Sequence, residues 1–171
     1  MKSLSRDQMV AAVERYFEAC NAADRRLFAE VLSEDCRHYF PANAGGPYLG
    51  RDAIADLWIG FVRSHGSRWT IDRMVCDGHH VVTEWSHFKP VVAELIRGSE
   101  WYLFDDDGKI CDIWAHYAAP RDRARSDNVL EAFPYRELGY AMTPPVLPAA
   151  ALRSREEATL GVPARVDEKG G

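Results

Sequence analysis

Residues 69–89, W-T-I-D-R-M-V-C-D-G-H-H-V-V-T-E-W-S-H-F-K, decide the fold. Apolar or β-branched residues alternate with polar ones on both sides of Asp77-Gly78, a dipeptide that favours a tight hairpin turn. The pattern therefore predicts two antiparallel strands joined by that turn, over 69–76 and 79–89.

The strand pattern continues toward the C-terminus and gives way to helical spacing toward the N-terminus. Further strands are expected over 95–104 and 110–117, on either side of an acidic turn. Before the hairpin, apolar residues recur at helical intervals in three segments. The helices are expected over 5–22, 25–32 and 51–65, with a short strand over 36–40.

Three helices followed by a meandering sheet predict an α+β fold. We expect a cone-shaped, curved antiparallel sheet wrapped around the N-terminal helix, with an extended C-terminal tail. Residues 1–120 form one domain, long enough to bury a core. Residues 121–171 contain five prolines and are expected to extend this domain, packing on the core or on a neighbouring subunit. The end, from about residue 153, is expected to be a loose helix or disordered.

Composition and charge exclude several classes of function. The formal net charge of −5 gives no electrostatic basis for binding nucleic acid or an anionic membrane. No apolar run approaches the roughly 20 residues of a membrane span, and we expect no signal peptide. The protein is therefore expected to be cytoplasmic. Its cysteines are expected to be small buried side chains in a reducing compartment: Cys20, Cys36, Cys76 and Cys111.

Three strings of sequence carry information beyond secondary structure. They are Glu14-Arg15-Tyr16-Phe17 with Asn21-Ala22-Ala23-Asp24 and Leu32-Ser33-Glu34-Asp35; Asp77 to Trp85; and Phe104 to Ile110 with Trp114. Together they resemble the nuclear-transport-factor-2-like superfamily, which includes ketosteroid isomerases, polyketide cyclases, scytalone dehydratase and limonene epoxide hydrolase. The resemblance implies a cone-shaped catalytic domain over residues 1–120. It does not imply one activity, because the fold hosts many chemistries and also non-catalytic members.

The resemblance also implies roles for individual residues. Ketosteroid isomerases form an oxyanion hole from a first-helix tyrosine and a protonated strand carboxylic acid, positions that Tyr16 and Glu100 occupy here. Their catalytic aspartate precedes a proline on the first strand, where this chain has Phe40. The charged triad of the epoxide hydrolases falls on Trp85, His87 and Ala115. Neither mechanism is therefore expected, and another pocket residue must supply the base.

Three side chains are candidates for that base, and each also has a structural interpretation. The unperturbed pKa of a histidine is near neutrality, and His87 is expected to face inward by strand alternation; the alternative is that His87 is a satisfied core histidine. His38 is the second candidate, and two histidines in one cavity would resemble scytalone dehydratase. Lys89 is either a buried base with a lowered pKa or a solvated edge lysine. Glu100 is then either the protonated donor or the partner of a cation such as Lys89, and Tyr16 is either a phenol donor or a core tyrosine.

Aromatic side chains are expected to line the pocket and to bind an apolar or aromatic small molecule, although an aromatic core explains them as well. The sequence contains no glycine-rich nucleotide loop and no convergent metal-ligand spacing, so neither a cofactor nor a metal is expected. The candidate substrate-binding residues are Phe40, Tyr48, Trp58, Trp85, Tyr102 and Tyr117.

These residue types suit proton abstraction followed by elimination or a bond shift. We expect a cofactor-independent lyase or dehydratase. The alternatives are an isomerase or polyketide-cyclase-type enzyme, and a non-catalytic ligand-binding module. The resemblance extends to lyases that release formaldehyde from lignin-derived diarylpropane or phenylcoumaran compounds, a reaction that the long tail and aromatic pocket would suit. An exposed sheet face leads us to expect a homodimer or homotrimer.

Overall fold

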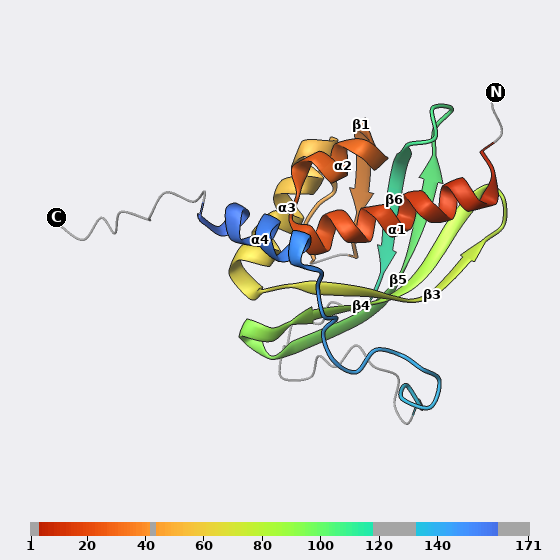
Figure 1. Cartoon of the computed structure of the whole chain (residues 1–171). Coiled ribbons are helices and arrows are strands. Elements are labelled where there is room, and N and C mark those ends of the chain that lie inside the picture. The colour runs from red at the N-terminus through yellow and green to blue at the C-terminus, as the bar shows by residue number, and fades with distance from the viewer. Residues whose placement is uncertain (1–3, 42–43, 118–132, 161–171) are drawn as a thin grey trace.

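The computed structural model describes residues 4–41, 44–117 and 133–160. A curved sheet forms its centre, and helix α1 lies across the hollow side of the sheet (Figure 1). The helices are α1 (Arg6–Ala22), α2 (Arg25–Val31), α3 (Arg51–His65) and α4 (Ala149–Leu160), with a 3₁₀ turn η1 (Pro90–Val92). The strands are β1 (Leu32–Tyr39), β2 (Tyr48–Leu49), β3 (Arg68–Cys76), β4 (His80–Lys89), β5 (Glu94–Phe104) and β6 (Ile110–His116).

The predicted α+β fold with a curved sheet is confirmed, and one strand makes the sheet mixed. In the described residues the strand order is β2-β1-β6-β5-β4-β3. The strands β3 to β6 form the expected antiparallel meander. Strand β1 instead pairs in parallel with β6. The long connection between them, which includes α3 and the meander, permits this direction because parallel strands require a crossover.

The hairpin predicted from Asp77-Gly78 is present and sets the register of the site. The Asp77 carboxylate accepts hydrogen bonds from two backbone N–H groups at the turn. Gly78 adopts a φ of 94°, which favours glycine. Strands β3 and β4 pair so that Trp69 lies opposite His87, and paired residues point to the same face of a sheet.

Two boundaries near the first strand differ from the prediction. Helix α2 ends at Val31, and β1 begins at Leu32 rather than at residue 36, because Leu32 is extended and fully buried. The short strand β2 was not predicted; its Tyr48 pairs with His38 of β1.

Helix α1 supplies one side of the core. Ser5 and Gln8 form the predicted capping box at its start. Its buried face packs against the concave side of the sheet, and the apolar area removed from water there is the main stabilising contribution of the helix. The buried residues of α1 include Met9, Val13, Tyr16, Phe17 and Cys20.

The segment 133–160 packs on the core, as Figure 1 shows for the blue part of the chain. Tyr135 and Tyr140 lie over the guanidinium group of Arg97, on the outer face of the sheet rather than over a pocket. The chain then rises to α4, a regular fourth helix beside α1 and α3. The end of the chain, expected from about residue 153 to be a loose helix or disordered, is helical over 153–160 as part of α4, and residues 161–171 lie outside the described residues.

No helix in the described part of the chain is long and apolar enough to cross a membrane. The cysteines are free thiols there: Cys20, Cys36 and Cys76 are buried, and Cys111 is half-buried.

Candidate functional site

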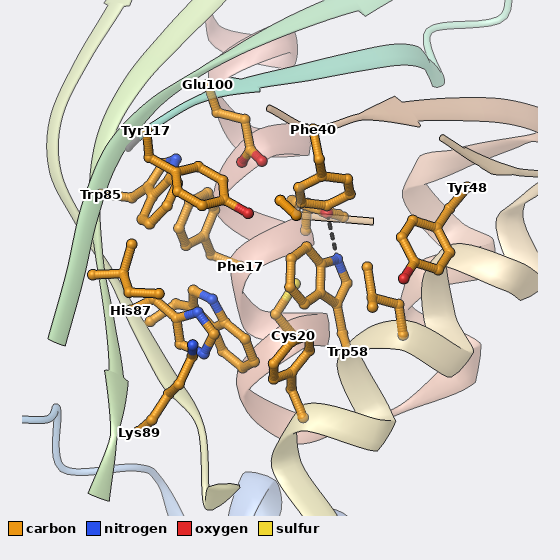
Figure 2. Close-up of a pocket in the computed structure, with 16 residues that line it drawn as sticks. Phe17, Cys20, Phe40, Tyr48, Trp58, Trp85, His87, Lys89, Glu100 and Tyr117 are labelled. Atoms are coloured by element: carbon orange, nitrogen blue, oxygen red, sulfur yellow. Dashed lines mark hydrogen bonds between the residues drawn. The ribbon is translucent and has the colours of Figure 1, made fainter. Parts of the chain in front are cut away.

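A cavity lies between α1, α3 and the concave face of the sheet, and nearly all of the predicted site residues surround it (Figure 2). Its volume is about 60 Å³. The lining residues are Tyr16, Phe17, Cys20, Phe40, Ala44, Tyr48, Leu57, Trp58, Phe61, Trp69, Trp85, His87, Lys89, Ile96, Glu100 and Tyr117.

A chain of hydrogen-bonding groups forms one wall. The indole Nε1 of Trp58 donates to Tyr16 Oη at 2.7 Å. Tyr16 Oη lies 3.5 Å from His38 Nδ1, a long contact, and His38 Nε2 lies 2.9 Å from Glu100 Oε1. Tyr102 Oη donates to Glu100 Oε2 at 2.5 Å. Tyr16 and Glu100 thus reach the cavity while His38 links them from behind.

The phenol groups of this wall hold their protons tightly. Burial raises the pKa of Tyr16 well above its ordinary value, and the nearby Cys20 and Glu100 add to the rise. Burial and Glu100 likewise raise the pKa of Tyr102. Burial raises the pKa of Tyr117 to about 12. At neutral pH these groups are therefore protonated and able to donate hydrogen bonds.

His87 occupies the other side of the cavity, in an aromatic environment. Its Nε2 lies 2.8 Å from Ser67 Oγ, and its ring stacks on Trp69 with a centroid distance of 4.3 Å. Burial, and then the charge of Lys89, lower the pKa of His87 well below its ordinary value. His87 is therefore a neutral imidazole at pH 7, able to accept a proton.

Lys89 points inward, as the first of its two interpretations required, but its partner differs from the one suggested. Its Nζ donates to Glu94 Oε2 at 2.5 Å, whereas Glu100 pairs with His38. The suggested pair fails because Lys89 and Glu94, which lie on either side of the 3₁₀ turn η1, are cross-strand partners. Lys89 Nζ also lies 5.4 Å from the ring centre of Phe61, at the His87 end of the cavity.

Aromatic rings form the remaining walls. Phe40 stacks on His38 with centroids 4.1 Å apart and meets Tyr48 edge-on. Trp85 lies against Gly98 of β5: a Cβ at Gly98 would be 2.6 Å from Trp85 Cζ2. The glycine thus permits the close approach of the indole ring that shapes this side of the cavity.

Of the predicted site residues, the structure brings Tyr16, His87, Lys89 and Glu100 to one cavity. His38 and Tyr102 do not line the cavity, because both are fully buried behind Glu100. Tyr102 faces inward from β5 but packs against Tyr16 of α1. Apart from Tyr102, all of the predicted aromatic lining residues do line the cavity: Phe40, Tyr48, Trp58, Trp85 and Tyr117.

Several lining residues were not singled out from the sequence. Helical spacing placed Phe17, Cys20 and Phe61 in the core, which is also where they lie, so no local signal separated lining from packing. The Ser67 hydroxyl was missed for a different reason: a serine after a helix-ending glycine resembles an ordinary turn. In the described residues no group of three side chains has the arrangement of a metal site.

Residues 13–113 match the family of SnoaL-like domains, and no curated protein matches the chain. A solved structure from Methylobium petroleophilum PM1, a protein of unknown function with a cystatin-like fold, is 36% identical. The alignment covers 86% of this chain and 99% of that one, with a TM-score of 0.67.

Two more distant structures share the fold. A proposed ketosteroid isomerase from Kribbella flavida is 20% identical, over 75% of this chain and 92% of that one, with a TM-score of 0.58. A proposed SnoaL-like polyketide cyclase from Jannaschia is 14% identical, over 68% of this chain and 89% of that one, with a TM-score of 0.54.

Proposed function

The chain belongs to the family of SnoaL-like domains, and from this membership we propose that it is a cofactor-independent enzyme that transfers a proton on a small apolar carbonyl compound. One observation carries the proposal. A single cavity is lined by the neutral imidazole of His87, by hydroxyl groups that hold their protons, and by aromatic rings. A proton acceptor and hydrogen-bond donors around one apolar space are the groups that enolate chemistry requires.

In the proposed step, His87 removes a proton from the carbon next to a carbonyl group. The electron pair of the C–H bond becomes a carbon–carbon double bond, and the carbonyl oxygen gains negative charge. The hydroxyl groups of Tyr16 and Tyr117, two of the residues that line the same cavity as His87, donate hydrogen bonds to that oxygen. Such donors in a site that excludes water typically contribute about 3 kcal/mol each to the transition state.

The fate of the enolate gives two finer classes. Return of the proton to another atom gives an isomer. Attack of the enolate carbon on a second carbonyl group of the same molecule, whose oxygen then takes the proton, closes a ring. The names of the Kribbella and Jannaschia proteins favour these fates. Loss of a hydroxyl group from the next carbon, as water that takes the proton held by His87, gives the lyase or dehydratase expected from the sequence. That class is supported by hydroxyl groups in the cavity lining that can hydrogen-bond a leaving oxygen.

The size of the cavity bears on the substrate. A volume of about 60 Å³ is below the roughly 150 Å³ of a cavity that holds benzene, so the walls must move apart for a compound with one ring and further still for a lignin-derived diaryl compound. Release of formaldehyde from such diaryl compounds is therefore not part of this proposal. The paired charges of Lys89 and Glu94 lie at the His87 end, whereas the carbonyl oxygen of the substrate is proposed to face the Tyr16 wall.

A panel of single-ring aromatic and alicyclic ketones, hydroxyketones and alcohols tests the proposal, with products followed by mass spectrometry. We expect turnover of at least one compound by the wild type, and a loss of about 100-fold or more in His87→Gln. The matched control is His80→Gln, since His80 lies outside the cavity lining and should retain activity. Tight binding of a panel member without any turnover would favour the non-catalytic ligand-binding module instead.

A further inference from the structure

The guanidinium group of Arg155, on α4, lies on the carboxyl ends of two other helices. Its Nη1 donates to the backbone oxygens of Asn21 and Ser67, at 2.9 and 2.8 Å. Its Nη2 donates to the backbone oxygen of Gly66 at 3.1 Å. Asn21 is in the last turn of α1, and Gly66 is the C-cap of α3. Carbonyl groups at helix ends lack internal partners and carry partial negative charge, so one cation satisfies both ends.

Among the described residues, Arg155 forms no ion pair with a carboxylate. The three backbone carbonyl groups are therefore the groups that compensate the charge of its guanidinium there. Burial lowers the pKa of Arg155, which reflects the cost of removing the guanidinium from water. A cation held in this way has a planar fork of donors that a lysine does not have.

Two of the contacts that hold His87, the Ser67 hydrogen bond and the Trp69 stack, lead back to these carbonyl groups. The Ser67 hydroxyl, bound to His87 Nε2, belongs to the residue whose carbonyl Arg155 holds. The Asn21 side chain accepts from the backbone N–H of Trp69 at 2.8 Å and donates to its carbonyl at 2.9 Å. The Trp69 ring in turn stacks on His87. The Arg155 guanidinium therefore anchors Ser67, which hydrogen-bonds His87. It also anchors Asn21, which holds the backbone of Trp69, the residue that stacks on His87.

We propose that Arg155 is a positioning residue for His87, and that α4 therefore completes the site. The proposal rests on the proposed function only in taking His87 as the proton acceptor. Helix α4 lies outside residues 13–113, which match the family, so the positioning belongs to the extension of this chain. Without the guanidinium, three carbonyl groups lose their donor. The turn at Gly66, which has a φ of 65°, then loses the contact that fixes the Ser67 hydroxyl.

The charged and titratable groups around His87 determine what a displaced ring would show. Lys89 on β4 and His65 at the end of α3 both disfavour protonation of His87, after burial. Glu94 on β5 faces Lys89 rather than His87, and Arg155 acts through Ser67 without contacting the imidazole. Because burial is the largest cause, loosening the Ser67 contact and the Trp69 stack admits water and raises the pKa of His87.

Nuclear magnetic resonance of protein labelled at histidine tests the proposal without any substrate. The His87 imidazole signal is assigned by its absence in His87→Gln. In Arg155→Met we expect this signal to shift and its titration midpoint to rise. The matched control is Arg63→Met, because Arg63 Nε donates to the carbonyl of Ala158 and so joins α3 to the same helix without touching the Ser67 turn. There the signal and midpoint should match the wild type.

A second variant covers the case in which Arg155→Met does not fold. Arg155→Lys keeps a cation at the helix ends but not the forked donors, and we expect the His87 signal to shift at a melting temperature near that of the wild type. A wild-type signal and midpoint in Arg155→Lys, or in a folded Arg155→Met, would overturn the proposal. The NMR readout needs no turnover. An inactive protein can therefore still show that Arg155 positions His87, and an active protein can show that it does not.

Discussion

His38 and Glu100 form a buried pair, with His38 Nε2 2.9 Å from Glu100 Oε1 and at most 5% of either residue exposed. Strands β1 and β5 supply the two residues, which are 62 positions apart in the chain. The pair lies behind the cavity wall, and Tyr102 donates to the second carboxylate oxygen. Glu100 is therefore held at both oxygens while it faces the cavity, and this wall depends on His38.

We predict that His38→Phe destabilises the protein. The phenyl ring keeps the stacking surface for Phe40 but removes both ring nitrogens, so Glu100 loses a partner in a buried site. The expected loss in the free energy of unfolding is about 1–3 kcal/mol, measured by urea denaturation. Glu84→Gln on the exposed outer face is the control, with an expected change of less than about 0.5 kcal/mol. A change in His38→Phe no larger than in this control would contradict the role of the pair.

The buried His87 predicts a pH dependence of stability. Its folded-state pKa is well below the ordinary 6.5, so below that pH the unfolded chain binds a proton that the folded protein does not. The free energy of unfolding therefore falls as the pH falls through 6.5 toward the folded-state pKa. Urea denaturation between about pH 7.5 and about pH 5.5 should show a smaller decrease in His87→Gln than in the wild type. Equal slopes in the two proteins would show that His87 is not buried and neutral.

Two glycine substitutions should change stability in opposite directions. A Cβ at position 98 would lie 2.6 Å from Trp85 Cζ2 and 2.9 Å from the His116 carbonyl oxygen, so Gly98→Ala should cost about 1–3 kcal/mol of unfolding free energy. Gly60 lies within α3 with nothing within 4 Å of an added Cβ, so Gly60→Ala should stabilise by up to about 1 kcal/mol. Denaturation curves compare both variants. A neutral Gly98→Ala would mean that Trp85 moves freely in the cavity wall.

The outer face of the sheet carries a row of cross-strand partners: Tyr39, Trp114, Trp101, Val82 and Val75. Trp101 and Trp114 stack there with centroids 6.1 Å apart, and Tyr39 and Val75 are exposed. An apolar row of this kind supports the expected homodimer or homotrimer. Size-exclusion chromatography with light scattering should show an oligomer for the wild type and a smaller species for Trp101→Glu. A monomeric wild type would contradict this expectation.

The sequence predicted the elements that depend on local spacing. Alternation with a period of two placed Trp85, His87 and Lys89 on one face of β4, and the Asp77-Gly78 turn fixed where that strand begins. Strict periodicity makes such predictions reliable, because a slip by one residue would expose the whole apolar face.

The partners of the same residues could not be predicted. Lys89 meets Glu94 because of a short 3₁₀ turn, and His38 meets Glu100 because β1 joins β6 in parallel, an arrangement without a local signal. Arg155 and Asn21 act through backbone carbonyl and amide groups, which every residue carries. Their roles therefore appear only when the helix ends are seen together.

Exchange of substrate hydrogen for deuterium tests the central claim most directly, because it detects proton abstraction whatever the later fate of the enolate. The protein is incubated in deuterium oxide with single-ring ketones, and the carbon next to the carbonyl group is followed by nuclear magnetic resonance. The account predicts exchange with the wild type and with His80→Gln, and a loss of about 100-fold or more with His87→Gln. Equal exchange in wild type and His87→Gln, or no exchange above the protein-free rate for any ketone that binds, would contradict it.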